Sequence, residues 1–291
     1  MLAAQDLGIP TAVFIFSWDN LPKATMVVES DYYFVWSKHM KTELLYYYPY
    51  IEEDQVFVTG TPQFEPHFNA ELLLSKQDFF AEYQLDPNKK YICFSGDDFT
   101  TSPDDPQFLS DLVNAVRKLN NKGLSLGIVF RRCPVDFSDR YDAVLQENKD
   151  LIATIAPKWE KMGERWNAIL PTKADLALQV NTIAHTELVV NLGSSMVFDY
   201  VAFDKPCIYI NYDMPSVKRV FNYVHFRSMP NEDAVVWVNN PDEMADKIEK
   251  LLADKAIAVK NAALWFEKIN QHPVDKASER ILNSIKQIIN R

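Results

Sequence analysis

The residues best suited to chemistry are two serines and a carboxylate that follow an apolar run. Leu188, Val189 and Val190 form an apolar run that leads into Asn191, and Gly193 follows two residues later. Ser194 and Ser195 then stand where a helix would begin, so their hydroxyls and the unbonded N–H groups of a helix N-terminus would face a ligand. Asp199 follows about one turn later, at a position suited to a ribose hydroxyl. The spacing predicts a phosphate site, although a helix cap without any ligand would use the same turn.

Three further loops carry polar residues at or near the ends of predicted elements. Gly96 follows the apolar run 91–95, and Arg132 follows the next apolar run along the chain. A guanidinium group matches the geometry of phosphate oxygens. Thr172 lies in a polar loop before a predicted helix, and His185 lies just beyond that helix. Because ligands of open α/β sheets bind beyond the carboxyl ends of the strands, we expect these groups to converge.

The predicted donor site comprises Gly96, Arg132, Thr172, His185, Gly193, Ser194, Ser195 and Asp199. In this hypothesis the arginine and the serines hold phosphates, the carboxylate holds a ribose, and the loop 170–173 lies near a base. Structural alternatives stay open, since the arginine could be solvated and His185 could be a satisfied core histidine. Asp97 and Asp98 could bind a metal, but an exposed turn is the favoured interpretation.

Several well-known catalytic motifs are missing from the sequence. It has no GxSxG, no GxxxxGK[ST], no GxGxxG and no HExxH, and its five histidines are scattered. This excludes the usual signatures of serine hydrolases, P-loop proteins and zinc proteases.

Composition narrows the function classes further. The chain has 291 residues, of which 47% are hydrophobic, and 30 basic against 40 acidic residues give a net charge of −10. An acidic chain is a poor nucleic-acid binder, so we expect no such partner. Its 3 cysteines form no CxxC pair, which indicates buried thiols in a reducing compartment. With no membrane-spanning apolar run and no basic leader, we expect a cytoplasmic protein.

The alternation of apolar runs and helical periodicity predicts an α/β fold. Three strands are expected within 1–66, and a doubly wound sheet usually has more, so the first domain looks incomplete. Residues 67–89 are predicted to connect the domains. A second Rossmann-like domain is expected over 90–270, and an amphipathic C-terminal helix over 271–291 returns towards the first domain. Because residue 1 falls within a predicted helix, we interpret the chain as lacking an upstream part.

With these residues in view, the chain resembles glycosyltransferases of the GT-B architecture. It is most similar to enzymes of bacterial surface-polysaccharide biosynthesis and to the related CDP-glycerol glycerophosphotransferases. The resemblance rests on the turn 193–195 with Asp199, and on the passage 199–206 from helix to strand. The run 131–134 lies where relatives carry an arginine before a His-Pro pair. Cys133 replaces that histidine, so its donor contact does not carry over.

The resemblance implies a transfer from a nucleotide-sugar donor to a glycan or lipid-linked acceptor, with no cofactor and no metal. In GT-B enzymes a general base comes from the N-terminal domain, which makes Asp19 in the loop 17–20 the candidate base. A capping role for Asp19 is an equal alternative.

Two rival functions remain open at this stage. A nucleotide-sugar 2-epimerase would share the architecture, and a truncated domain would bind nucleotide without turnover. Contact with the inner face of a membrane is a further open question, because the run 46–48 with Tyr50 could form an aromatic interfacial patch instead of packing inside.

Overall fold

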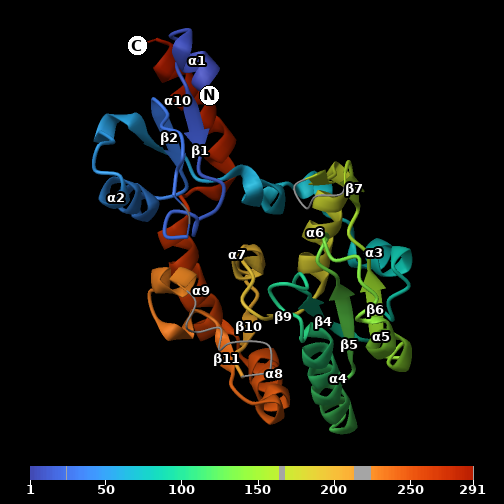
Figure 1. Ribbon diagram of the computed structural model, residues 1–291. Coiled ribbons are helices and arrows are strands. Elements are labelled where there is room, and N and C mark those ends of the chain that lie inside the picture. Colours follow the sequence, from blue (N-terminus) through green and yellow to red (C-terminus); the bar gives the residue numbers. More distant parts are fainter. Residues whose placement is uncertain (24, 164–167, 213–223, 291) are drawn as a thin grey trace. The chain divides into compact units, whose positions relative to one another are not determined.

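The computed structural model describes residues 1–23, 25–163, 168–212 and 224–290 (Figure 1). The chain forms two compact units, and both are assembled from separate stretches of sequence. The first comprises Met1–Phe68, Tyr223–Pro230 and Leu264–Arg291. The second comprises Asn69–Asn222 and Asn231–Ala263.

The first unit contains a three-stranded parallel sheet in the order β1-β2-β3. Its strands are β1 (Ala12–Phe14), β2 (Tyr32–Val35) and β3 (Val56–Val58). Helix α2 (Lys38–Tyr47) connects β2 to β3, and Ser37 caps it by accepting the Met40 N–H at 3.2 Å. The helices α1 (Leu2–Asp6) and α10 (Ala277–Ile289) also belong to this unit.

Residues from the C-terminal stretch complete the core of the first unit. The ring of Phe64 packs edge-on against Trp36 at 6.1 Å and against Phe266 at 4.9 Å. Trp18 meets Trp265 in the same way at 5.6 Å. All five side chains are buried. A small sheet with three short strands thus gains its stability from aromatic residues some 200 positions away in the chain.

The second unit contains a six-stranded parallel sheet in the order β11-β10-β9-β4-β5-β6. Numbered along the chain, its strands follow the order 3-2-1-4-5-6 of dinucleotide-binding folds. The order reverses between β4 and β9, which pair directly. The strands are β4 (Lys90–Ser95), β5 (Leu126–Arg131), β6 (Ile152–Ile155), β9 (Val189–Asn191), β10 (Cys207–Ile210) and β11 (Val236–Val238).

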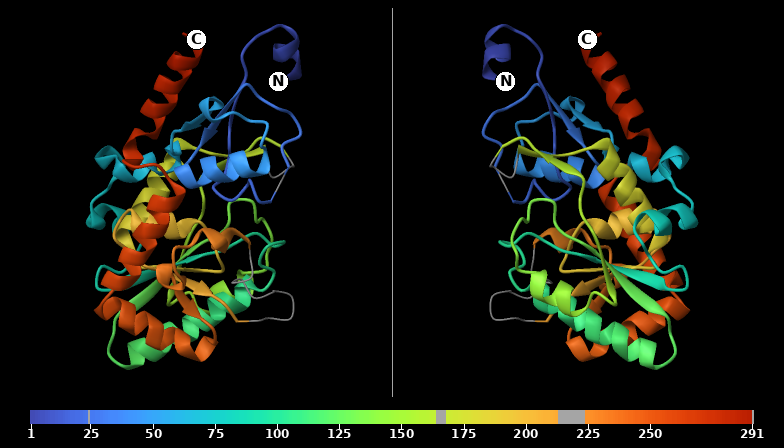
Figure 2. Two further views of the ribbon diagram at one scale, coloured as in Figure 1. Left: turned by 90° about the vertical axis from the view of Figure 1, so that its left-hand side faces the viewer. Right: turned by 90° about the vertical axis from the view of Figure 1, so that its right-hand side faces the viewer.

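Helices cover both faces of this sheet (Figure 2). One face packs against α4 and α8, which touch each other, and the other packs against α3 and α6. Two elements were not predicted from the sequence, namely the strands β7 and β8 of an antiparallel hairpin. The bounds are α3 (Lys76–Glu82), α4 (Asp105–Asn121), α5 (Asp142–Glu147), α6 (Lys173–His185), α7 (Met196–Val201), α8 (Met244–Ala253), α9 (Ala256–Ile269), β7 (Trp159–Lys161) and β8 (Ile169–Pro171).

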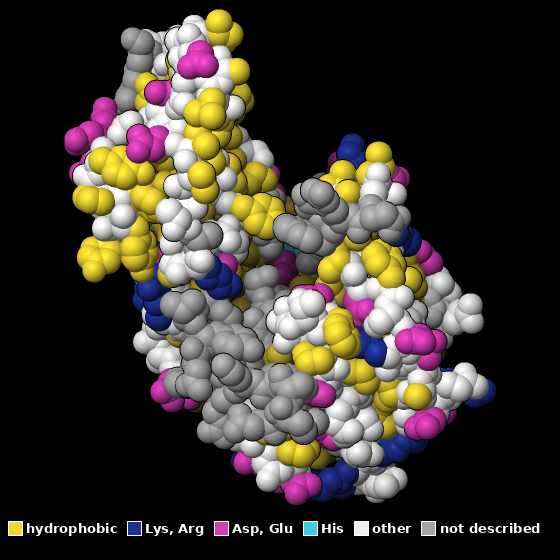
Figure 3. Space-filling view, in the orientation of Figure 1, with side chains coloured by type: hydrophobic (Ala, Val, Ile, Leu, Met, Phe, Trp, Pro, Cys, Tyr) yellow, Lys and Arg dark blue, Asp and Glu magenta, His cyan; other side chains and the backbone are white. Residues whose placement is uncertain are grey.

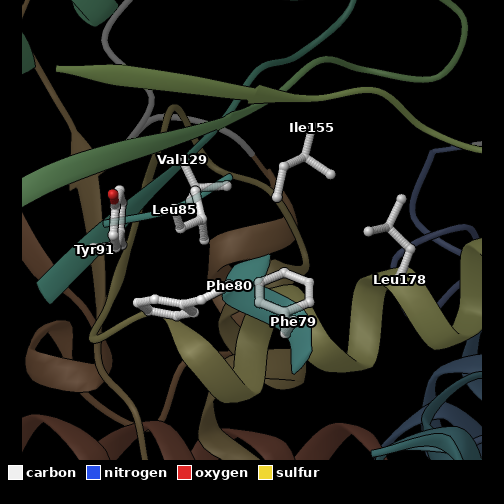
Figure 4. Close-up of a cluster of buried hydrophobic side chains, with 7 residues drawn as sticks. All are labelled: Phe79, Phe80, Leu85, Tyr91, Val129, Ile155 and Leu178. Atoms are coloured by element: carbon white, nitrogen blue, oxygen red, sulfur yellow. The ribbon is translucent and has the colours of Figure 1, made fainter. Parts of the chain in front are cut away.

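The segment predicted as a connector instead belongs to the core of the second unit. Phe79 and Phe80 on α3 pack with Leu178 of α6 and with sheet residues in one buried cluster (Figure 4). Burial of the two phenylalanine rings holds this segment against the sheet of the second unit. The predicted domain ends also differ from the observed units, because α9 continues from the second unit into the first at Ala263. The predicted fold class, an α/β protein with two parallel-sheet units of the GT-B type, is confirmed.

Candidate functional site

The turn after β9 lies at the point where the strand order of the second unit reverses, which is where ligands of doubly wound sheets bind. The turn is held from three sides. Asn191 Oδ1 accepts the Ser194 N–H at 2.9 Å, and Ser194 Oγ accepts the Met196 N–H at 3.3 Å. Tyr209 donates its hydroxyl to the Ser194 carbonyl at 2.5 Å. Gly193, Ser194 and Ser195 are partly exposed, and Ser195 is the N-cap of α7 without a side-chain cap bond.

Asp199 does not lie on the surface of this turn. It is 2% exposed, on the inward side of α7, and it accepts a hydrogen bond from Gln179 Nε2 at 3.4 Å. The predicted ribose contact stays a prediction. All six residues of α7 are buried, so the packing around this helix sets the exposure of the carboxylate.

The loop after β4 does not offer its N–H groups to a ligand, contrary to the prediction. Gly96 donates to the Arg131 carbonyl at 2.9 Å, Asp97 to Asp105 Oδ2 at 2.6 Å, and Asp98 to Asp97 Oδ1 at 2.9 Å. Gly96 is required for packing, since a Cβ there would lie 2.7 Å from the hydroxyl of Tyr141.

A polar network that the sequence did not reveal fixes this loop. Arg140 donates to Asp136 Oδ2 at 2.7 Å, to the Asp97 carbonyl at 2.7 Å and to the Tyr141 hydroxyl at 2.9 Å. Tyr141 in turn donates to Asp105 Oδ2 at 2.8 Å. Burial raises the pKa of the Asp97 carboxyl to about 6, and the neighbouring Asp105 carboxylate adds to the rise. The network joins the loops that follow β4 and β5 into one rigid edge of the sheet.

The two arginines at the end of β5 both bond within the protein, and Arg132 does not extend towards a ligand as predicted. Arg132 donates to the Ser138 carbonyl and lies 5.2 Å over the ring of Tyr141, so it braces its own loop. Arg131 is buried, and its Nη2 donates to both carboxylate oxygens of Asp175, at 2.8 and 3.1 Å. Arg131 Nη1 is also buried, yet it has no hydrogen-bond partner among the residues that the structure describes. Buried donors without a partner are uncommon in folded proteins, which makes this nitrogen a candidate for further study.

The Asp175 carboxylate, at the start of α6, accepts hydrogen bonds from several neighbouring residues. Besides Arg131 it accepts the Lys158 N–H at 2.8 Å and the Trp159 indole N–H at 2.6 Å. Thr172 is the N-cap of α6, where it accepts the Asp175 N–H at 3.1 Å and donates to the Lys158 carbonyl at 2.6 Å. The hydroxyl of Thr172 therefore has a structural role, which corrects its assignment as a donor contact.

His185 lies at the wrong edge of the sheet for donor binding. It ends α6, next to the amino end of β9, whereas ligands bind beyond the carboxyl ends. Its ring stacks on Phe79 at 5.1 Å, and its Nε2 lies 3.0 Å from the Leu74 carbonyl. Burial lowers the pKa of this imidazole. The structural alternative holds for His185.

Asp19 lies in a well-ordered loop of the first unit. Ser17 Oγ donates to Asp19 Oδ1 at 2.7 Å, and Lys23 forms an ion pair with Oδ2. Asn20 Oδ1 accepts the Ser17 N–H at 2.8 Å. The Asp19 side chain is 12% exposed. Asp19 thus accepts from side-chain donors, whereas Asn20 accepts the backbone N–H of the turn, and the role of Asp19 as a base stays a prediction.

Two features are absent from the part of the chain that the structure describes, namely a membrane-spanning helix and a metal-binding cluster. No helix there is long and apolar enough to cross a bilayer. No three His, Cys, Asp or Glu side chains in the same residues are grouped so as to hold a metal ion.

The C-terminal third of the chain is similar to a known protein family. Residues 182–287 match the family described as CDP-Glycerol:Poly(glycerophosphate) glycerophosphotransferase. The matched segment covers β9, α7, β10, β11 and the helices that follow, and so contains the turn 193–195. This confirms the resemblance predicted from the sequence. A search of curated proteins found no match.

Solved structures share the fold over nearly the whole chain. S. aureus MnaA in complex with UDP is 18% identical with a TM-score of 0.64, covering 99% of this chain and 72% of its own. The wall teichoic acid polymerase TagF with CDPG is 16% identical with a TM-score of 0.54, covering 90% and 57%. A UDP-N-acetylglucosamine 2-epimerase is 12% identical with a TM-score of 0.55, covering 88% and 57%. The chain therefore has the fold of the GT-B enzymes but spans only 57% of the length of two of these three relatives.

Proposed function

We propose that the protein is a GT-B glycosyltransferase that moves a sugar from a nucleotide-sugar to a hydroxyl of a surface-glycan or lipid-linked acceptor, without a metal. The observation that carries the proposal is the pairing of an exposed turn at the strand-order reversal with the unpartnered Nη1 of Arg131. The fold neighbours crystallised with UDP and with CDPG support the choice of a nucleotide-activated donor.

The spacing of these two groups suits a nucleoside diphosphate. The turn 193–195 follows β9 and Arg131 ends β5, and only β4 lies between these strands. Adjacent strands are about 4.8 Å apart, so the ends of β9 and β5 lie roughly 10 Å from each other along the sheet edge. In this proposal the turn holds a phosphate through its N–H and hydroxyl groups, while Arg131 receives an oxygen of the donor further along the edge.

In this proposal, residues of this chain stabilise the leaving diphosphate and accept the proton of the acceptor hydroxyl. The acceptor oxygen forms a bond to the anomeric carbon as the bond from that carbon to the diphosphate oxygen breaks. The electron pair leaves on the nucleoside diphosphate, whose charge Arg131 and the turn would stabilise. The acceptor proton passes to the Asp19 carboxylate, which acts as general base.

Nucleotide binding tests the donor site. Calorimetric titration with UDP and with CDP should give a dissociation constant between micromolar and millimolar for the wild type. Ser195→Glu should weaken binding at least tenfold, because it places a negative charge beside the phosphates. Ser75→Glu, a change at the N-cap of α3, is the matched control and should bind as the wild type does. Absence of binding to the wild type, or equal binding by both variants, would refute the donor site.

A second candidate function is a nucleotide-sugar 2-epimerase, since one fold neighbour is such an enzyme. The reaction products distinguish an epimerase from a transferase. Incubating the protein with UDP-N-acetylglucosamine alone, with no acceptor, should leave the sugar unchanged if the protein is a transferase. A new sugar nucleotide in that mixture would establish the epimerase instead.

A further inference from the structure

The first unit contains a hollow that none of the functions above uses. Its volume is about 300 Å³, and it lies where the loop after β1 meets the end of α2. Ligand pockets of small molecules begin at about this size, so the hollow has room for one ring and its substituents. Among the residues that the structure describes, its lining comprises Leu21, Pro22, Lys23, Thr25, Tyr47 and Tyr48.

Hydrogen bonds hold the walls of the hollow in place. Tyr48 is 8% exposed, and its hydroxyl accepts the Met26 N–H at 2.9 Å. The Tyr47 hydroxyl accepts a bond from Arg227 Nη1 at 2.9 Å, and the guanidinium lies 5.8 Å from the Tyr47 ring. A binding site with fixed walls loses little entropy when a ligand enters.

The charges at the rim cancel. Lys23, whose side chain is 44% exposed, is paired with Asp19, which is the candidate base. An ammonium and a carboxylate side by side can donate to one ligand hydroxyl and accept from another, but together they give no net attraction for an anion. Arg227, the other cation nearby, is paired with Glu43.

The walls present tyrosine rings and apolar groups, and the rim presents one hydrogen-bond donor and one acceptor. This combination suits a ligand ring whose faces are apolar C–H groups and whose edges carry hydroxyls. Exposed aromatic residues continue outside the hollow, at Tyr46 (79% exposed) and Tyr50 (51% exposed). Hydrophobic side chains are prominent on the unit that holds α1 and α2 (Figure 3).

We propose that this hollow binds an uncharged sugar or polyol unit, the end of the acceptor whose hydroxyl meets Asp19. The assignment of the hollow as an acceptor site rests on the proposed function. Binding of a sugar or polyol to the hollow can be measured without a nucleotide donor.

Ligand-observed saturation-transfer NMR tests the inference. The probes are the methyl glycosides of glucose, galactose, N-acetylglucosamine and N-acetylmannosamine, together with glycerol and, as the anionic comparison, glycerol 3-phosphate. At least one uncharged probe should bind the wild type in the millimolar range and more tightly than glycerol 3-phosphate. Thr25→Trp, which fills the hollow, and Lys23→Met, which removes the rim donor, should each weaken that probe at least fivefold. Ile257→Ala, at a position of the second unit that is 72% exposed, is the control and should leave the affinity unchanged.

The outcomes separate the two proposals. Calorimetry with UDP or CDP on the same samples reports the donor site, so loss of sugar binding with intact nucleotide binding in the Thr25→Trp variant supports the hollow as a distinct sugar site. If the wild type binds a sugar but no nucleotide, the sugar site is supported and the donor site is refuted. The inference is overturned if no uncharged probe binds, if glycerol 3-phosphate binds best, or if Lys23→Met and folded Thr25→Trp both bind as the wild type does.

Discussion

Replacing Asp175 by asparagine should destabilise the second unit by about 3–5 kcal/mol, the usual effect of removing one partner from a buried ion pair. The carboxylate accepts both bonds from Arg131, and the side chains are 1% and 7% exposed respectively. Asparagine keeps the shape of the side chain but not its charge, so the buried guanidinium loses its compensation. The amide would also present N–H groups to the donors of Lys158 and Trp159 if it were turned the wrong way.

A second arginine–aspartate pair provides the matched control. Arg117 donates from Nη1 and Nη2 to the two oxygens of Asp150 at 3.0 and 2.9 Å, whereas Arg131 uses Nη2 alone for both oxygens of Asp175. Its side chains are 43% and 62% exposed, so water and salt screen the interaction. Exposed pairs contribute about 0–1 kcal/mol, and Asp150→Asn should therefore cost no more than that.

Differential scanning calorimetry resolves the two cases. For a unit of this size, each kcal/mol shifts the melting temperature by about 2–4 °C. The transition of the second unit should therefore fall by roughly 6–20 °C in Asp175→Asn and by less than about 4 °C in Asp150→Asn. Equal shifts for the two variants would refute the reasoning, because burial would then not decide the strength of the pair.

Three further outcomes are expected. Gly96→Ala should cost about 1–3 kcal/mol in urea unfolding, because the new Cβ meets the Tyr141 hydroxyl at 2.7 Å, and a variant as stable as the wild type would contradict that contact. The raised pKa of Asp97 favours its protonated form in the fold, so its contribution is present below pH 4 and is lost as pH rises through about 6. Asp97→Asn should therefore be roughly 2–3 kcal/mol more stable than the wild type at pH 7 but not at pH 4, and a constant difference would count against this. Phe79→Ala should lower the stability of the second unit by about 3–5 kcal/mol, whereas Phe68→Ala, at a position 49% exposed, should change little in the same melting experiment.

The sequence alone determined the architecture and the position of the candidate turn. Apolar β-branched runs such as 188–191 specify buried parallel strands, since only a strand covered on both faces can be apolar throughout. The break at Gly193 then placed the turn correctly after its strand. These features are local, because they depend on the chemistry of neighbouring residues in the chain.

Only the tertiary structure decided which polar side chains reach solvent and which are used inside. Arg131 and Arg132 are adjacent and chemically alike, yet one is buried against Asp175, 44 positions away, and the other braces a nearby loop. Whether Asp199 faces out or in depends on what packs around α7, and the sequence does not state that. The hollow beside Lys23 likewise exists only because the chain brings Tyr47 close to Leu21, Pro22 and Thr25. Side-chain orientation and burial are set by long-range packing, so they follow from the assembled fold and not from any single segment.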